Sequence, residues 1–489
     1  MAKEKKQYPE DFKTMFGVSV MGLAQVVATG LIAGTLMLYI TDYSGLYAGV
    51  AGRAAQVAAL MLLVGRIWDA INDPLLGFVM DRSPRTRWGR YKPFIFLSIP
   101  ISSLLVVALF NIPADLSDTI KVVLIVVLYI IFDTVFTLQP FNSLIQTLTR
   151  DANVRAKLLI APRIVSLFFA IALTFFLPAA IALGPDGVTP NIGLAVIVFV
   201  APVTLISMLG VALVREGRHS VDEETVTPKD FITMFKRNRP LFISLLVLLF
   251  GGFLFNLTQV ASVYYIKYAF GVENLGRNTA ILGIVSIFSI IASAFLSKLL
   301  LKRFTPGVCV MLAYGTASVV LAVLWLLNLS GPISSMTIFV PLLALFYLGN
   351  STAFIPNQII NMECMDYNRY ILGKSLQGTT NAMAGFIAKL QAALGSALVG
   401  FVLAAVGYDA QLYETATNIP ASLFSGLGIV YFALPALFGF IAVGVMYFYP
   451  LLKKSQRDRV YAEIEQRNQA AETSSADSSG LLDESAVAI

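Results

Sequence analysis

The sequence has few charged residues. Aspartate, glutamate, lysine and arginine make up 13% of its 489 residues, about half the share of an ordinary soluble domain. It has one histidine, His219, in a polar stretch, and two cysteines, Cys309 and Cys364. These scarcities exclude a histidine proton relay and give no sign of a disulfide framework or a metal cluster. The pattern GxxxxGK[ST] is absent and no nucleophile–base constellation is visible, so we expect no ATPase, no other enzyme and no cofactor.

Hydrophobic residues, in contrast, make up 57% of the chain. They fall in runs of about 20 residues, the length of a helix that crosses a bilayer. We therefore predict an all-α, multi-pass protein of the plasma membrane, with the bacterial inner membrane as its expected location. The start, MAKEKKQYPEDFKTMF, lacks a cleavable signal pattern. The twelve expected spans are 14–41, 53–82, 93–112, 120–149, 158–184, 190–214, 240–268, 276–301, 307–329, 333–360, 378–406 and 421–450.

The expected spans divide into two halves of six. The halves are 1–214 and 240–450, joined by a charged linker at 215–239 and followed by a largely disordered tail at 451–489, in which a basic stretch, KKSQRDR (453–459), precedes a short helix. PEDFKTMF (9–16) and PKDFITMF (228–235) precede the first span of each half and share P-x-D-F-x-T-M-F, which favours duplication. Repeated halves place substrate and ion sites at their interface, near the membrane midplane. We expect the protein to function as a monomer.

Lysine and arginine residues gather in alternate links. They are concentrated in the amino-terminal segment, the Arg82–Lys92 cluster, the central linker and the tail. The opposite links carry only Arg53, Lys121, Lys267 and Arg277. The positive-inside rule therefore predicts that both termini are cytoplasmic, and it explains the net charge of +6 without any nucleic-acid partner. We interpret the tyrosines and Lys267 of YYIKY (264–268) as residues of the outer membrane-interface belt.

One polar stripe interrupts the second span. Arg66, Asp69, Asn72 and Asp73 are three or four residues apart and share a helix face. Ionisable groups at membrane depth are costly, and two carboxylates one turn apart repel each other unless a proton or another cation lies between them. Pro74 also leaves the Ala70 carbonyl without its helical donor. The stripe predicts a Na⁺ or H⁺ site at Asp69, Asn72 and Asp73, although a structural ion pair between Arg66 and Asp69 is the alternative.

Other polar residues inside spans are candidates for substrate binding. Lys389 has no carboxylate within one turn of its own helix, so its partner is the second-span carboxylates, Asp133 or an anionic substrate, in a permanent or a switchable pair. Amides and a hydroxyl near Pro140 suit a polar solute, although interhelical hydrogen bonding explains them equally well. Gly385, Gly395 and Gly400 favour close helix packing. The remaining candidates are Asp133, Gln139, Asn142, Ser143, Arg163, Asn256 and Gln259.

The run RIWDAINDPLLGFVMDRSPRTRWGRYKPF (66–94) resembles the signature of the glycoside–pentoside–hexuronide:cation symporters of the major facilitator superfamily. It combines a D-x-x-x-D-P stripe with a D-R…R-W-G-[RK]-[FY]-[RK]-P-F loop. YITDYSGL, PFNSLIQTLTRD…APR, YYIKYAFG and M-D-Y…A-K also fit, and the resemblance spans roughly 12 to 450. It implies the major facilitator fold, cation ligands at Asp69, Asn72 and Asp73, and a Lys389 that links cation and sugar sites. It also implies that Arg163 begins the fifth span and that the cytoplasmic gate includes Asp81, Arg82, Arg87 and Arg90. We expect Arg66 to belong to the gate as well.

Three positions depart from the galactoside-transporting members of that family. Their first-span aspartate has no counterpart in Gly22-Leu23-Ala24-Gln25, where Gln25 is the remaining substrate candidate. Leu138 and Asn142 replace an aspartate and an aromatic residue around Pro140. The loss of acids beside Arg163 and Lys389 leaves a positive pocket, which favours an acidic sugar. GKSLQG (373–378) also lacks the Arg and Glu that family members usually carry before the eleventh span.

The residues and the resemblance together predict a symporter. It would import a small polar solute, a glycoside, sugar or sugar acid, together with Na⁺ or H⁺, by alternating access of the two halves. The first alternative is a transporter-like solute sensor, although the tail contains no recognisable output domain. The second is an uncoupled facilitator or an exporter. Sequence alone leaves the solute and the cation open.

Overall fold

The computed structural model describes residues 11–149 except 49 and 51, a few positions between 154 and 169, and residues 191–216, 236–271, 274–372, 377–409 and 420–463. The described part of the chain is built from helices and the links between them. Because the bilayer core offers no water to pair with the backbone, a helix satisfies its N–H and C=O groups within its own segment. Asp11, Asn191 and Asn238 each accept a hydrogen bond from the first turn of the helix that they cap.

The first group of helices comes from the amino-terminal part of the chain. α1 and α2 meet at Gly22, and a π-helical turn, η1, extends α2. Pro140 separates α5 from α6, because a proline lacks the N–H that would continue the helix. The bounds are α1 Phe12–Met21, α2 Leu23–Leu38, η1 Tyr39–Tyr43, α3 Arg53–Arg82, α4 Lys92–Leu109, α5 Asp118–Thr137, α6 Phe141–Leu148 and α8 Ile192–Leu213.

The second group follows residue 236. α13 and α14 meet at Ala353, and a π-helical turn, η3, joins α17 to α18. The bounds are α10 Arg239–Ala269, α11 Leu275–Leu301, α12 Pro306–Asn328, α13 Met336–Thr352, α14 Phe354–Leu372, α15 Gln377–Ala405, α17 Ala421–Gly428, η3 Ile429–Ala433 and α18 Leu434–Tyr447. A further helix covers 454–463. The short helix expected in the tail therefore begins within the basic stretch 453–459 and not after it.

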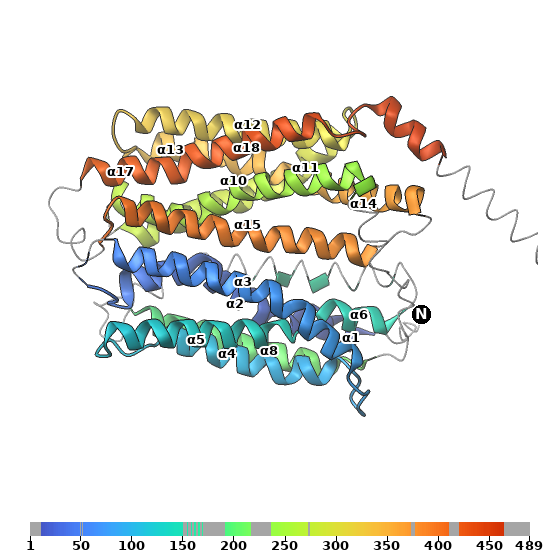
Figure 1. Cartoon of the computed structure of the whole chain (residues 1–489), viewed down its shortest axis with the longest axis horizontal. Helices are drawn as coiled ribbons and strands as arrows, with labels where there is room; N and C mark the ends of the chain where they lie inside the picture. The colour runs from blue at the N-terminus through green and yellow to red at the C-terminus, as the bar shows by residue number, and fades with distance from the viewer. Residues whose placement is uncertain are drawn as a thin grey trace, which may run out of the picture.

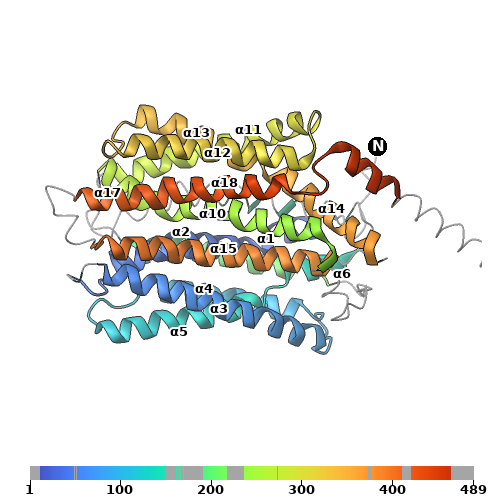
Figure 2. The same cartoon turned by 45° about the horizontal axis from the view of Figure 1, so that its top comes forward.

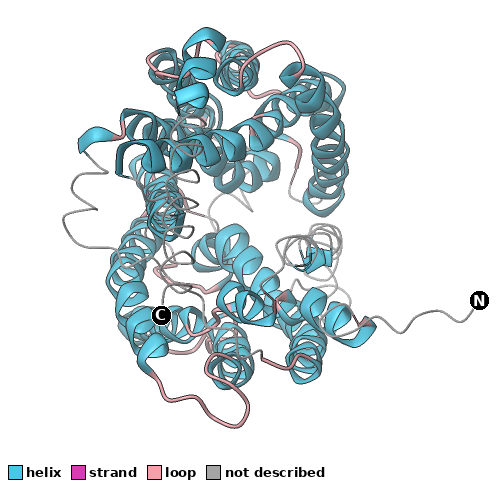
Figure 3. Cartoon of the chain, turned by 90° about the vertical axis from the view of Figure 1, so that its right-hand side faces the viewer, coloured by secondary structure: helices cyan, strands magenta, loops and turns pink. Residues whose placement is uncertain are grey.

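The helices run nearly parallel (Figures 1 and 2) and form two groups, with α1–α8 on one side and α10–α18 on the other (Figure 1). α3 and α15 lie side by side where the groups meet (Figure 1). The start of α1 and the end of α18 lie at the same end of the bundle, which we call the terminal end. We call the opposite end, with the 43–52 link, the distal end. Figure 3 looks along the bundle at the terminal end and shows the two groups as separate clusters of helices.

Ten helices in the described residues are long and apolar enough to cross a membrane. α3 is not among them because charged residues interrupt it, although its thirty residues are long enough to span. Every expected span has a helical counterpart except 158–184, most of which lies outside the described residues together with its candidate Arg163. The predicted single span at 120–149 is wrong in detail, because the chain breaks at Leu138–Pro140.

Candidate functional site

The middle of α3 carries the polar stripe. Asp69 and Asn72 are 3% and 5% exposed, and the side chain of Asp73 is 35% exposed. One helical turn separates Asp69 from Asp73, so both carboxylates lie on the same face of α3. The side chain of Arg66 lies outside the described residues.

Lys389 of α15 reaches this face from the other helix group. Its Nζ lies 2.9 Å from Asp69 Oδ1 and donates a second hydrogen bond to Asp73 Oδ2. Of the partners considered for this lysine, the structure therefore selects the carboxylates of the second expected span. The ammonium lies where a cation between two repelling carboxylates is needed.

Thr137 of α5 completes the cluster. Its hydroxyl donates to Asp73 Oδ1 at 2.8 Å and accepts from Asn72 Nδ2 at 3.4 Å. It thus ties the amide and a carboxylate of α3 to the neighbouring helix. Sequence reasoning missed Thr137, although its position four residues after Asp133 places both on one face of α5.

The cluster carries one negative charge when its three ionisable groups are charged. Asp69 and Asp73 contribute two negative charges and Lys389 one positive charge. A single monovalent cation would balance the remainder. Carboxylate, amide and hydroxyl oxygens are the hard ligands that suit Na⁺, and a carboxylate can equally take a proton.

The polar side chains of α5 and the break after it pack largely within the first helix group. Asp133 is buried, and Thr134 Oγ1 accepts a hydrogen bond from Trp68 Nε1 at 2.9 Å. Gln139 donates through Nε2 to Ser102 of α4 at 2.9 Å, while its buried Oε1 has no hydrogen-bond partner among the described residues. The side chain of Asn142 lies outside the described residues.

The remaining substrate candidates lie on α2 and α10. Gln25 is half-buried, and Gln259 is exposed. Asn256 is half-buried and donates to the Gly252 carbonyl of its own helix at 3.0 Å. Their role in substrate binding stays a prediction.

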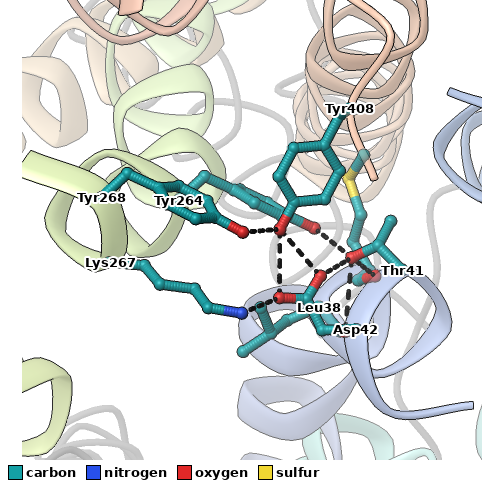
Figure 4. A network of polar contacts seen from close by, with 8 residues as sticks. Leu38, Thr41, Asp42, Tyr264, Lys267, Tyr268 and Tyr408 are labelled. Carbon is teal, nitrogen blue, oxygen red and sulfur yellow. Dashed lines mark hydrogen bonds and ion pairs between the residues drawn. The ribbon is translucent and has the colours of Figure 1, made fainter. Parts of the chain in front are cut away.

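A second polar cluster joins the two helix groups at the distal end (Figure 4). Asp42 of η1 pairs with Lys267 of α10 at 2.7 Å and accepts a hydrogen bond from the Tyr408 hydroxyl at 3.1 Å. Thr41 and Tyr264 share a 3.0 Å hydrogen bond, as do Tyr268 and Tyr408 at 2.9 Å. We call these contacts among Thr41, Asp42, Tyr264, Lys267, Tyr268 and Tyr408 the distal lock.

The distal lock is buried. The side chains of Lys267 and Asp42 are only 3% and 1% exposed. Burial and the Asp42 carboxylate raise the pKa of Tyr408 well above its usual value, so its hydroxyl keeps the proton that it donates. The interpretation of YYIKY as an interface belt is therefore wrong: Tyr264, Lys267 and Tyr268 face the other helix group instead of lipid headgroups.

Small residues bring the backbones together beside the lock. The Gly52 N–H donates to the Tyr408 carbonyl at 2.8 Å, and a Cβ at this left-handed position would strike the Ala404 carbonyl. Gly400 of α15 likewise packs against Ala59 of α3, which confirms close packing there. Gly395 packs against α10, whereas a Cβ at Gly385 would meet no atom of the described residues within 4 Å, so the close packing predicted there is not seen among them.

At the terminal end, the predicted gate residues have varied surroundings. Arg82 and Arg87 are exposed, and Arg87 lies over the Trp88 ring. The Arg90 N–H donates to Glu216 at 2.7 Å, a contact within the first helix group. The side chain of Asp81 lies outside the described residues. The gate therefore stays a prediction.

The sequence matches the protein family described as MFS/sugar transport protein over residues 18–453. It is 25% identical over 469 residues to the glucuronide carrier protein homolog of Escherichia coli, covering 93% of this chain and 96% of that protein. It is 26% identical over 463 residues to the isoprimeverose transporter of Lactiplantibacillus pentosus, covering 93% and 91%. An inward-facing bacterial homolog of the lysosomal transporter Spinster has a similar fold, with a TM-score of 0.66, 15% identity and coverage of 94% and 99%.

These similarities run along nearly the whole chain, and the fold agrees with them. The proteins are membrane transporters and not enzymes, so this chain is an integral multi-pass membrane protein that belongs to a sugar-transport family. The chain is a member of the glycoside–pentoside–hexuronide:cation symporter family of the major facilitator superfamily.

Proposed function

We propose that the protein is a cation-coupled symporter that imports a sugar or glycoside by alternating access. The observation that carries this proposal is the position of Lys389, whose ammonium pairs with Asp69 and Asp73 across the two helix groups. The chain thereby supplies its own cation at the site where a coupling cation would bind.

Lys389 and the coupling cation would compete for the same oxygens. Na⁺ or H⁺ at Asp69 and Asp73 weakens their hold on the ammonium and frees Lys389 for the substrate. The pair is then switchable, and the empty carrier avoids two unbalanced carboxylates at membrane depth. One cation that enters down a typical potential contributes about 2.3 kcal/mol per 100 mV to solute accumulation.

We assign the terminal end to the cytoplasm and the distal end to the outside, with twelve spans in two six-helix halves, 1–214 and 240–450. The positive-inside bias supports this orientation. Two basic residues of the distal side, Lys121 and Lys267, are buried against protein partners, the Ser44 carbonyl and the Asp42 carboxylate. Neither lysine therefore counts as a free positive charge in a distal loop. The excess of free lysine and arginine at the terminal end is larger than the sequence alone indicates.

The substrate is a small sugar or glycoside. Relatives include proteins described as a glucuronide carrier homolog, an isoprimeverose transporter and a raffinose carrier, so both acidic and neutral sugars are in range. The positive pocket expected from the sequence loses the free charge of Lys389, because two carboxylates hold it. An acidic substrate would then depend on Arg163 or on the release of Lys389.

The coupling of solute transport to the cation can be tested by measuring uphill transport by the Asp73→Asn variant. This change leaves Asp69 and Lys389 as a neutral pair, so the cluster no longer attracts a second cation. In proteoliposomes with an imposed Na⁺ or pH gradient, we expect the accumulation ratio of a transported glycoside or glucuronide to fall to about 1, while counterflow exchange continues. Asp115→Asn, at an exposed loop carboxylate, is the matched control and should accumulate solute normally.

The same assay separates the alternatives. Uphill accumulation that survives Asp73→Asn would reject coupling through this cluster. Wild-type exchange without accumulation under either gradient would indicate a facilitator. Solute binding without exchange would indicate a sensor.

A further inference from the structure

We propose that a pocket at the terminal end of the first helix group binds the phosphate of an anionic membrane phospholipid. The pocket has a volume of about 1000 Å³ and lies between the loop that precedes α4 and the end of α8. It is separate from both the central cluster and the distal lock. Its lining residues are Arg85, Thr86, Arg87, Trp88, Gly89, Lys92, Phe96, Ala212, Arg215 and Glu216.

The pocket is strongly basic. Four of its lining residues are arginine or lysine and one is acidic. That acid, Glu216, already accepts hydrogen bonds from the backbone N–H groups of Arg90, Tyr91 and Lys92 at 2.7 to 2.9 Å. Its charge is therefore directed at the first turn of α4, where the helix dipole favours it. Arg85, Arg87 and Arg215 bring guanidinium groups to the lining, and guanidinium groups match phosphate geometry.

The fold holds this arrangement rigidly. Gly89 has a left-handed φ of +117°, and a Cβ there would overlap the Glu216 side chain. Lys92 Nζ donates to the Val214 carbonyl at 2.6 Å and so ties the start of α4 to the end of α8. The loop that carries Arg85 and Arg87 is thus fixed against the last turn of α8.

An apolar stripe leads from the pocket along the outside of the bundle. Leu97 and Leu104 of α4 are 64% and 69% exposed. Leu205 and Leu209 of α8 are also exposed, and Leu209 lies one turn before Ala212 of the pocket wall. In a membrane these exposed side chains face acyl chains, so the tails of a lipid whose headgroup lies in the pocket would find apolar side chains on the same two helices.

Aromatic residues favour a lipid over free phosphate. Trp88 is 51% exposed and packs edge-on against Phe96, with ring centroids 6.0 Å apart. Tryptophan gathers at the headgroup level of membranes. Basic pockets between helices on the cytoplasmic side bind anionic headgroups, and the terminal end is the proposed cytoplasmic side. A soluble phosphate would use the arginines but neither Trp88 nor the leucine stripe.

Native mass spectrometry of the full-length protein in detergent tests the site. Dioleoyl phosphatidylglycerol is titrated against wild type, the double variant Arg85→Gln/Arg87→Gln, and the control Lys302→Gln/Arg303→Gln. The control removes two exposed charges from the same end of the bundle, outside the pocket. We expect the dissociation constant of the first bound lipid to rise about 30-fold in the pocket variant and to stay unchanged in the control.

Several different results would overturn the proposed lipid site. Equal affinity in wild type and the pocket variant, or equal losses in both variants, overturns the proposal. So does wild-type affinity for dioleoyl phosphatidylcholine that matches the affinity for phosphatidylglycerol. Displacement of the lipid by millimolar inorganic phosphate would assign the pocket to a free anion. If the pocket variant does not fold, photoactivatable phosphatidylglycerol on the wild type decides, since its labels must fall within 85–104 or 205–216.

Discussion

Asp42→Asn should open the distal lock. Lys267 would then remain buried beside a neutral amide, and removal of one partner of a buried ion pair costs about 3–5 kcal/mol. Opening of the distal end returns the ammonium to water, so this cost falls mainly on the closed state. The lower value, about 3 kcal/mol, lowers the closed-to-open ratio about 100-fold.

Cysteine accessibility measures that shift. Ala55 is fully buried where α3 meets α15, and the native Cys309 and Cys364 are buried and can be replaced by alanine. In an Ala55→Cys background, Asp42→Asn should raise the rate of labelling by a membrane-impermeant maleimide at least tenfold. Asp118→Asn is the control, because this carboxylate accepts the Tyr47 N–H within the first helix group at the same end.

A double variant and the pH dependence of labelling also test the distal lock. Asp42→Asn/Lys267→Gln should label more slowly than Asp42→Asn alone, because the uncompensated charge is gone. Because the pKa of Tyr408 is raised in the closed state, its protonated hydroxyl stabilises that state fully at any pH below the ordinary tyrosine pKa. This stabilisation is lost only as the pH rises through the raised pKa. The contribution of Tyr408 should therefore stay constant between about pH 6 and 9. Equal labelling of wild type and Asp42→Asn would refute the lock.

Two other predictions concern packing. Gly400→Leu should lower the thermal unfolding temperature, since overpacking against Ala59 costs roughly 1–3 kcal/mol. Gly385→Leu on the same helix should not, because a Cβ there meets no described residue. Unchanged unfolding of Gly400→Leu would show that α3 and α15 can separate freely. Arg457→Ala should expose the 454–463 helix to limited proteolysis, because Arg457 pairs with the buried Glu363 of α14 at 2.6 Å. The control Arg459→Ala removes only an exposed pair with Glu463, and equal cleavage of the two variants would contradict the docking of this helix.

The central cluster could be anticipated because charges at membrane depth are rare and costly. Asp69, Asp73 and Lys389 each interrupt an apolar segment, so the sequence required a partner for every one of them. It left three possible partners for Lys389, because separate helices can be arranged in many ways. The register of α3 against α15, set partly by Gly400 and Ala59, decides among them.

The distal lock could not be separated from an interface belt by sequence. Tyrosine and lysine near the end of an apolar helix are typical of both, and only the contact with the other helix group distinguishes them. One signal was available: Asp42 and Lys267 are opposite charges at corresponding ends of the first span of each half. An expected ion pair between these corresponding positions of the two halves would have placed Asp42 next to Lys267. The break at Leu138–Pro140 was less predictable, because a proline within an apolar run can bend a helix without ending it.

The central cluster and the distal lock stabilise the same closed arrangement from two points on one interface. In both, a lysine of the second helix group pairs with an aspartate of the first. α3 connects the two sites, since Gly52, which caps its start, contacts Tyr408 and Asp69 lies about 26 Å further along the helix. A cation that displaced Lys389 would loosen only the central contact, because Asp42 would still hold Lys267. Opening of the distal end would therefore require both pairs to break, so a cation that released Lys389 without the sugar would leave the distal lock closed and would not leak through.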